Sequence, residues 1–230
     1  MISIILPTYE MSGNGTMFLS KCLYKILQQD YQNYEVIISD NSKDREIESL
    51  VENFHESRFK YFKSRHYGSA ANTNYGMSLA SGDIIKPMFQ DDYFFSTTCL
   101  SELANTEGKW FAYSRVQDVG GMLSPVIKPF WNPNIIRGYN TISTPSCIAF
   151  QLEYDVVPYR GLRQFFDDKL NWFMDVDFYY RLYKLYGEPT ILKSIVGVCE
   201  WKGRVTESIN HDIVIEEEEY INRKYNGNSL

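Results

Sequence analysis

The first 95 residues alternate short apolar strands with amphipathic helices, and this order constrains the fold more than any other feature of the chain. The β-branched runs at 2–7 and 34–40 stop abruptly at polar residues, as buried parallel strands do. Between them, apolar residues recur at helical spacing over 16–29. The alternation continues with predicted helices at 44–54 and 70–80 and predicted strands at 60–63 and 83–89. Strand–helix–strand repeats of this kind predict an α/β protein with a mostly parallel, Rossmann-like sheet flanked by helices.

The pattern is less regular in the second half of the chain. Here we expect helices at 99–105 and 174–187 and strands at 110–114 and 190–199. The segment 115–140 is rich in Pro, Gly and Asn and has no periodicity, so it is predicted to be a long loop.

No composition shift or linker marks a domain boundary, and we therefore expect one domain over the whole chain. The segment 211–230 is expected to be a charged C-terminal helix or tail, with 216–225 as a solvated face.

Charge and cysteine usage exclude several classes of protein. A net charge of −6 and a pI near 5.2 argue against a nucleic-acid partner. The four cysteines are scattered, which argues against a zinc site or a disulfide scaffold and favours reduced thiols. The N-terminus lacks the features of a signal peptide, and no apolar run reaches the length of a transmembrane span. These features predict a cytoplasmic protein and leave peripheral contact with a membrane open.

Three predicted strands end in polar residues, at 7–10, 40–42 and 91–92. In an open parallel sheet, ligands bind beyond the carboxyl ends of the strands, so these residues predict a nucleotide-sized site. Asp91 and Asp92 repel each other unless a cation such as Mg²⁺ or Mn²⁺ compensates them. The alternative is a solvated turn, which the flanking aromatic residues disfavour.

Four segments, in order along the chain, resemble the family 2 glycosyltransferases with the GT-A fold. They are "SIILPTYE", "YEVIISDNSKD", "GSAANTNYGMSLASGDIIKPMFQDDYF" and "FFDDKLNWFMDVDFYYRLYKLYG". Together they cover roughly 2–95 and 165–187. The resemblance implies that 1–95 form the nucleotide-binding half of the domain and that 96–210 form the half with the acceptor site and the catalytic base. The resemblance implies an inverting, metal-dependent transferase that moves a sugar from a nucleotide-diphosphate sugar, here a UDP-sugar, to a hydroxyl group. Mn²⁺ or Mg²⁺ would be the cofactor, and a glycan, glycolipid or glycoprotein would be the acceptor.

The resemblance also implies roles for individual residues. Asp175 would be the general base that deprotonates the acceptor hydroxyl, because a sugar hydroxyl must lose its proton as the new bond forms. Asp92 would be the principal metal ligand, assisted by Asp91. The nucleotide would contact Pro7, Thr8, Tyr9, Glu10, Asp40, Asn74 and Asp91. Weaker candidates are Trp172 and Met174 for the acceptor or sugar, and Arg65 and Arg204 for the diphosphate.

The chain departs from the family pattern at three positions. Phe89 stands where the first Asp of the D-x-D-D motif would be, and Ser39 replaces one Asp of the second motif. Thr73 lies where many members of the family have Arg, so the sequence does not show which residue would bind the diphosphate at this position. The base also has an alternative reading, because a carboxylate at a helix N-terminus is stabilised by the helix dipole, and Asp177 fits that reading as well as Asp175.

Two other functions are compatible with the same type of sheet. A sugar-1-phosphate nucleotidyltransferase would carry a Gly-rich loop after the first strand, where this chain has Pro7–Glu10. A non-catalytic module that binds nucleotide-sugars or glycans would have no need of both Asp92 and Asp175. The oligomeric state, the sugar and the acceptor are left open.

Overall fold

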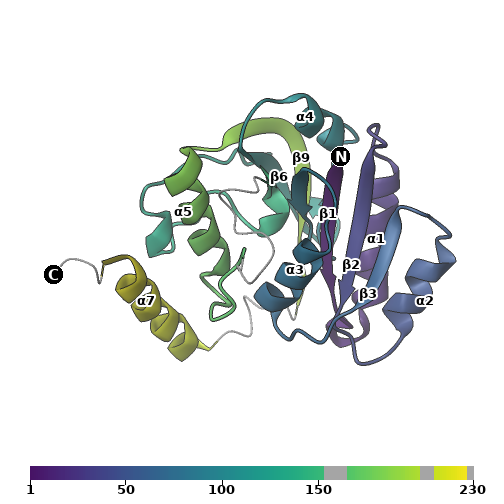
Figure 1. Ribbon diagram of the computed structural model, residues 1–230, viewed down its shortest axis with the longest axis horizontal. Coiled ribbons are helices and arrows are strands. Elements are labelled where there is room, and N and C mark those ends of the chain that lie inside the picture. Colours follow the sequence, from purple (N-terminus) through teal and green to yellow (C-terminus); the bar gives the residue numbers. More distant parts are fainter. Residues whose placement is uncertain (153–164, 203–209, 227–230) are drawn as a thin grey trace.

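The computed structural model describes residues 1–152, 165–202 and 210–226. Within them, nine strands form one sheet in the order β3-β2-β1-β4-β8-β6-β9-β5, with β7 paired to β6 (Figure 1). The strands are β1 Ile2–Thr8, β2 Tyr34–Asp40, β3 Phe59–Lys63, β4 Ile84–Pro87, β5 Tyr93–Phe94, β6 Trp110–Val119, β7 Met122–Leu123, β8 Ile148–Gln151 and β9 Thr190–Glu200. The helices are α1 Gly15–Leu27, α2 Glu46–Asn53, α3 Ser69–Ser78, α4 Cys99–Asn105, α5 Met174–Tyr186 and α7 His211–Asn226. Three short 3₁₀ turns are η1 Met11–Gly13, η2 Ile135–Arg137 and η3 Pro145–Cys147.

The N-terminal half of the sheet is parallel, as the alternating pattern predicts. β1 pairs with β2 from Ile2↔Tyr34 to Thr8↔Asp40, and it pairs with β4 on its other side. β3 adds to β2 in the same direction. The prediction of an α/β fold with a sheet flanked by helices is therefore confirmed.

The C-terminal half contains pairings that the sequence did not indicate. β8 is antiparallel to both β4 and β6, and the two-residue strand β5 is antiparallel to β9. The prediction of a strand at 110–114 followed by a loop was wrong, because β6 continues to Val119. Its extension pairs with β9 across a register shift between Tyr113 and Ser114. Two antiparallel steps through β8 restore the direction of β4 in β6, so the carboxyl ends of β1, β2, β4 and β6 lie at the same edge.

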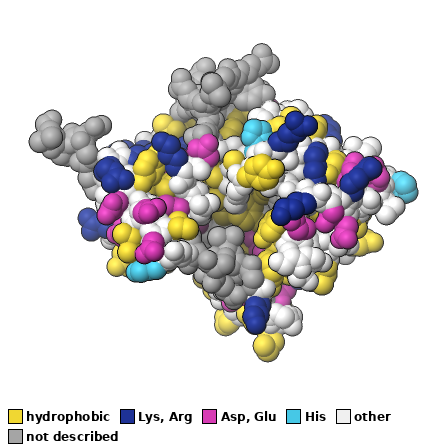
Figure 2. Space-filling view, turned by 90° about the horizontal axis from the view of Figure 1, so that it is seen from below, with side chains coloured by type: hydrophobic (Ala, Val, Ile, Leu, Met, Phe, Trp, Pro, Cys, Tyr) yellow, Lys and Arg dark blue, Asp and Glu magenta, His cyan; other side chains and the backbone are white. Residues whose placement is uncertain are grey.

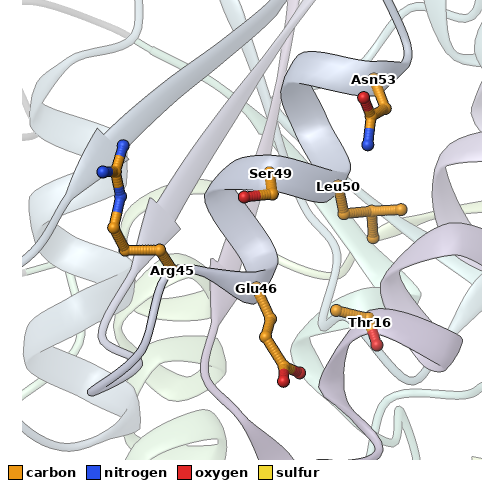
Figure 3. A pocket seen from close by; sticks show the side chains of 6 residues that line it. All are labelled: Thr16, Arg45, Glu46, Ser49, Leu50 and Asn53. Atoms are coloured by element: carbon orange, nitrogen blue, oxygen red, sulfur yellow. The ribbon is translucent and has the colours of Figure 1, made fainter.

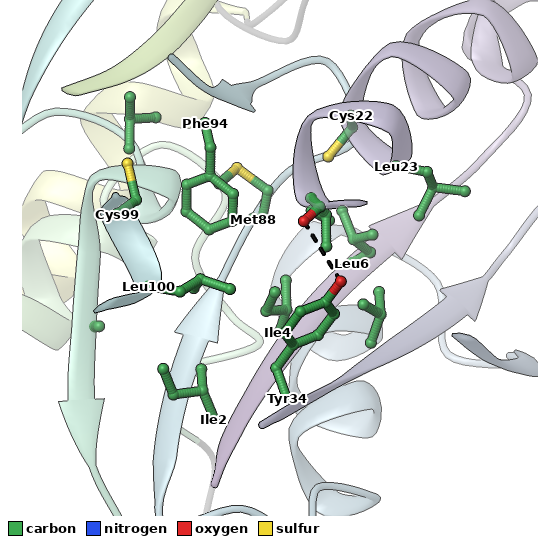
Figure 4. Close-up of a cluster of buried hydrophobic side chains, with 14 of the residues drawn as sticks. Ile2, Ile4, Leu6, Cys22, Leu23, Tyr34, Met88, Phe94, Cys99 and Leu100 are labelled. Atoms are coloured by element: carbon green, nitrogen blue, oxygen red, sulfur yellow. Dashed lines mark hydrogen bonds between the residues drawn. The ribbon is translucent and has the colours of Figure 1, made fainter. Parts of the chain in front are cut away.

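Alternation along each strand sends side chains to two hydrophobic layers. Ile4 packs into the layer beneath α1, α2 and α4, which Figure 4 shows, whereas the next residue, Ile5, packs into the layer beneath α3 and α5. In the first layer the Tyr34 hydroxyl donates a 3.4 Å hydrogen bond to the Ile26 carbonyl at the end of α1. Helices therefore cover both faces of the sheet (Figure 1).

Gly76 allows α3 to lie close to the sheet. A Cβ atom at this position would stand 2.8 Å from Cγ2 of Ile5 and 3.3 Å from Cβ of Ser39. Both contacts are closer than ordinary packing permits, so the helix approaches β1 and β2 only because this residue has no side chain.

The C-terminal helix differs from its prediction. α7 spans 211–226, and the expectation that its charged stretch is a solvated face was wrong for the inner side of the helix. Ile221 is 2% exposed and packs into the layer beneath α5, and Glu217 is 5% exposed. These residues are four apart and therefore share one face of the helix. Within 1–152, 165–202 and 210–226, no helix combines the length and apolarity that crossing a bilayer requires.

Candidate active site

The predicted site residues gather at the edge where β1, β2 and β4 end. Figure 2 views the molecule from this end, and the face is hollowed near its middle. Thr8 and Asp40 are opposite each other in the β1–β2 register, and the Asp91–Asp92 pair follows β4. The sheet thus brings together polar residues that are some 30 to 80 positions apart in the sequence.

The loop after β1 is fastened to the aspartate pair by a residue that the sequence did not single out. Gln90 accepts a 2.7 Å hydrogen bond from the Tyr9 N–H and donates to the carbonyls of Tyr9 and Gly15 at 3.0 and 3.1 Å. Tyr9 itself is 40% exposed, and burial, followed by the charges of Asp91 and Glu10, raises the pKa of its hydroxyl. Tyr9 and Asp91 therefore belong to one electrostatic environment.

Asp40, which is predicted to contact the nucleotide, is fully buried and already bonded inside the protein. One carboxylate oxygen accepts from the Ser42 N–H at 2.9 Å and from the Ser42 hydroxyl at 2.6 Å. The other accepts from the Tyr61 hydroxyl at 2.8 Å and from Lys63 Nζ at 3.2 Å. These bonds hold the loop after β2 in place. The contact of Asp40 with the nucleotide stays a prediction.

The asparagines of α3 join this helix to its neighbours. Asn74 exchanges two hydrogen bonds with the backbone of Phe166, at 2.8 and 2.9 Å, so its side chain anchors the segment before α5. Its predicted role at the nucleotide is not tested. Asn72 bonds Ser39 in both directions, accepting from its hydroxyl at 2.6 Å and donating to its carbonyl at 2.9 Å. Ser39 thus takes a structural role, because it joins β2 to α3.

The aspartate pair is divided between a buried and a half-buried carboxyl. Asp92 is 3% exposed and accepts from the Cys199 N–H at 3.0 Å and from the Thr144 hydroxyl at 3.1 Å. Burial and the charge of Asp91 raise the pKa of Asp92 to about 7, although hydrogen bonds from Ser146, Cys199 and Thr144 oppose the shift. Asp91 accepts a 2.9 Å bond from Trp201 Nε1.

Lys86 lies buried near this pair and was not predicted to matter. It has no exposed surface, and its Nζ donates to the carbonyls of Pro87 at 2.7 Å and Ser146 at 2.5 Å. Burial lowers its pKa to about 8, and Asp92 is one of the groups that oppose this shift. Two carbonyls thus satisfy an ammonium group that supports the loop around Ser146.

The aspartate pair fits a divalent cation in its chemistry, because the charge of Asp91 raises the pKa of Asp92 and added positive charge would stabilise both carboxylates. Mg²⁺ and Mn²⁺ use one or two carboxylates and complete their coordination with water and substrate phosphates. In the part of the chain that is described, no three His, Cys, Asp or Glu side chains converge on one point. The residues therefore suit a cation that is shared with a diphosphate.

The predicted base, Asp175, lies in the first turn of α5. One oxygen accepts a 2.7 Å bond from the Val176 N–H, and the other accepts a 2.7 Å bond from Asn140 Nδ2. Burial raises the pKa of Asp175 to about 7, against the hydrogen bonds from the backbone and Asn140, and Glu217 contributes in the raising sense. A pKa near 7 is the value that suits a general base at neutral pH. Asp177, the alternative, is fully buried and bonded to Arg181 at 3.0 Å.

The segment 140–146 connects the two aspartates and was predicted only as irregular chain. Asn140 binds Asp175 at its start, and Thr144 binds Asp92 near its end. Between them, Ser143 adopts a φ of 95°, a strained backbone for a residue with a side chain. The "NTISTPS" sequence has no helical or strand period, so this connection could be found only from the fold.

The weaker predicted residues have mixed positions. Trp172 is 38% exposed, whereas Met174 is 5% exposed and packs in the layer beneath α5. Arg65 is exposed in the loop that follows β3, at the same edge as the site. Arg204 lies outside the described residues.

A surface depression between α1 and α2 contains none of the predicted site residues (Figure 3). It is lined by Thr16, Arg45, Glu46, Ser49, Leu50 and Asn53. Arg45 pairs with Glu48 at 2.7 Å, so its charge is already compensated.

Known proteins resemble the chain in both sequence and structure. Residues 3–112 match the family model "Glycosyl transferase family 2". GalNAc(5)-diNAcBac-PP-undecaprenol beta-1,3-glucosyltransferase of Campylobacter jejuni is 31% identical over 116 residues, which cover 49% of this chain and 36% of the relative. The match thus spans about a third of the length of that relative.

Two solved structures share the fold. Residues 1–349 of S. aureus TarS in complex with UDP-GlcNAc superpose with a TM-score of 0.65 at 16% identity, covering 96% of this chain and 66% of that chain. The mannosyltransferase PcManGT of Pyrobaculum calidifontis, in complex with GDP-Man and Mn²⁺, gives a TM-score of 0.61 at 15% identity, covering 87% of this chain and 57% of PcManGT. The chain therefore has the GT-A fold. In sequence, residues 3–112 are similar to glycosyl transferase family 2.

Proposed function

We propose that the protein transfers a sugar from a UDP-sugar to a hydroxyl group of a lipid-linked glycan, with inversion at the anomeric carbon. The observation that carries this proposal is the bridge made by segment 140–146 between Asp92 and Asp175. It sets a carboxylate suited to a cation and a carboxyl with a pKa near 7 on either side of one loop. Such a pair fits a reaction in which a negatively charged diphosphate departs on one side and the acceptor hydroxyl loses its proton on the other.

Asp175 accepts the proton of the acceptor hydroxyl while the oxygen of that hydroxyl forms a bond to the anomeric carbon. The bond from that carbon to the phosphate oxygen breaks on the opposite side, and UDP leaves. Asn140 orients the Asp175 carboxylate through its 2.7 Å bond. Asp92 and Asp91 would hold Mn²⁺ or Mg²⁺, which supplies positive charge to the departing diphosphate.

The donor and acceptor classes are supported by the relatives. TarS binds UDP-GlcNAc, and the Campylobacter relative acts on a diphosphoundecaprenol-linked glycan. PcManGT binds GDP-Man with Mn²⁺, so the preference for UDP is itself part of the proposal. A polyprenyl-linked acceptor would bring the protein to a membrane surface as a peripheral protein.

The test is a transfer assay with a panel of UDP- and GDP-sugars, Mn²⁺ and an undecaprenyl-diphosphate-linked saccharide, read as nucleotide release and as product mass. We expect UDP release that requires the acceptor and falls by about 10² or more in Asp175→Asn. The matched control is Asp168→Asn, which alters an exposed carboxylate seven positions earlier. Pyrophosphate release from a nucleoside triphosphate and a sugar 1-phosphate would show a nucleotidyltransferase instead. Donor binding without turnover would show a binding module.

A further inference from the structure

The C-terminal helix α7 reaches the backbone immediately before the proposed base. The Glu217 carboxylate on α7 accepts hydrogen bonds from the N–H groups of Asn171, Trp172 and Phe173, at 2.7, 2.9 and 3.0 Å. These donors belong to the turn that leads into α5, whose second residue is Asp175. Phe173 is the N-cap of α5, and a buried carboxylate at this end of the helix also complements the helix dipole.

We propose that Glu217 is a positioning residue for the catalytic base, holding the 171–173 turn and thereby the position of Asp175 at the start of α5. The inference rests on the proposed function of Asp175. Glu217 is 5% exposed, so its three hydrogen bonds are shielded from competing water. Its charge also raises the pKa of Asp175, although burial is the main cause of that shift.

A second set of contacts joins α7 to α5 and to the segment before α5. Lys224 Nζ bridges the Asp167 and Asp177 carboxylates at 2.7 and 2.8 Å, and Asp177 lies one turn or less from the base. The remaining contacts are hydrogen bonds from Tyr220 to Asp167 and from Tyr225 to Asp177, at 2.8 and 2.7 Å. α7 is therefore attached at both ends of this face, and Glu217 cannot leave the turn without breaking a buried network.

The other charged and titratable groups near Asp175 come from the elements packed around it. Tyr179 lies one turn further along α5, and the charge of Asp175 raises the pKa of its buried hydroxyl. Arg115 on β6 acts on the same hydroxyl in the lowering sense, and Asp92 acts in the raising sense. These groups are unchanged by a substitution at Glu217, so a shift at Asp175 in such a variant reports on Glu217 itself.

The experiment compares Glu217→Gln with Glu218→Gln, which removes the same charge from an exposed neighbour on the same helix. The pKa of Asp175 is measured by ¹³C NMR of its carboxyl carbon, assigned with Asp175→Asn. We expect a fall of about 0.5 unit in Glu217→Gln, the effect of one partly screened charge, and no change in Glu218→Gln. Equal pKa values in the parent protein and both variants would overturn the coupling.

Steady-state transfer separates positioning from general stability. We expect kcat to fall by about tenfold or more in Glu217→Gln, with the donor KM within about twofold of the parent. Glu217→Asp keeps the charge but is one methylene shorter, so it should lose kcat without the shift in pKa, and it serves if Glu217→Gln does not fold. A folded variant that keeps the parental kcat would overturn the proposal. Because the NMR measurement needs no turnover, an inactive parent protein would refute the proposed function and still leave the Glu217–Asp175 coupling measurable.

Discussion

Replacing Asp175 with Asn should change how the stability of the protein depends on pH. The folded protein raises the pKa of this carboxyl to about 7, mainly by burial, whereas an unfolded Asp titrates near about 3.9. The folded state therefore binds a proton that the unfolded state releases. The resulting stabilisation is complete below the unfolded pKa and is lost as the pH rises through the folded pKa.

The folded and unfolded pKa values of Asp175 differ by about three units, and each unit corresponds to about 1.36 kcal/mol. The stabilisation from this proton is therefore at most about 4 kcal/mol. Asp175 keeps part of its surface in solvent, and screening reduces the effect, so we expect about 1–3 kcal/mol. The Asn variant has no such proton to lose. In the variant, the NH₂ group of the new side chain faces either Asn140 Nδ2 or the Val176 N–H, which are both donors. One hydrogen bond is therefore lost, which lowers the free energy of unfolding by about 1 kcal/mol at every pH.

Urea unfolding, followed by tryptophan fluorescence between about pH 5 and about pH 8, measures this difference. The free energy of unfolding of the variant minus that of the parent should rise by about 1–2 kcal/mol over this range, because about a third of the change falls below pH 5. Asp168→Asn is the matched control, since that carboxylate is exposed, and its difference should stay flat. A pH-independent difference for Asp175→Asn would show that the carboxyl has an ordinary pKa and would refute the argument.

Three further predictions concern other parts of the structure. In Asp92→Ala, Mn²⁺ should no longer raise the melting temperature in the presence of UDP, because the metal stabilises the fold only where it binds. Gly76→Ala should lower the free energy of unfolding by about 1–3 kcal/mol, since its Cβ would meet Ile5 at 2.8 Å. Lys224→Met should lower it by about 1–3 kcal/mol, because buried Asp177 loses one cationic partner and keeps another.

Each of these predictions has a control on the same element or of the same type. Asp168→Ala should keep the response to Mn²⁺, and a lost response there would point to a general loss of folding. Ser78→Ala alters an exposed position of α3 and should be nearly neutral, so equal effects at Gly76 and Ser78 would contradict the packing argument. Arg223→Met removes an exposed ion pair with Glu219 and should cost about 0.5 kcal/mol or less. If Lys224→Met lowered the free energy of unfolding no more than Arg223→Met does, the result would contradict the stabilising role of the Lys224 contacts.

The N-terminal half could be predicted in detail because its information is local. Strands such as 34–40 are continuous apolar runs, and helices such as 16–29 have the 3.6-residue period, so each element can be recognised without its partners. Right-handed crossovers then place the strand ends at one edge, which is why Thr8 and Asp40 could be assigned to one site. The family resemblance added Asp175, which no local pattern distinguishes from Asp177.

The connections across the site could not be predicted, since they depend on contacts between segments with no period of their own. β8 has only four residues, and it exists because β4 and β6 provide partners on both sides. The bonds of segment 140–146 and the burial of Lys86 follow from that placement.

The charged helix α7 shows most clearly the difference between what the local sequence indicates and what tertiary contacts decide. Its sequence indicates a charged helix or tail rich in glutamate, and by itself this pattern indicates a solvated face. Tertiary structure decided that Glu217 enters the protein, where three N–H groups in the turn before α5 compensate the cost of burying a carboxylate. The periodicity of the chain therefore determined the parallel N-terminal strands, the helices between them and the position of the aspartates at the strand ends. Packing alone decided which buried charges meet, because the free energy of a buried charge depends on partners that are distant in sequence.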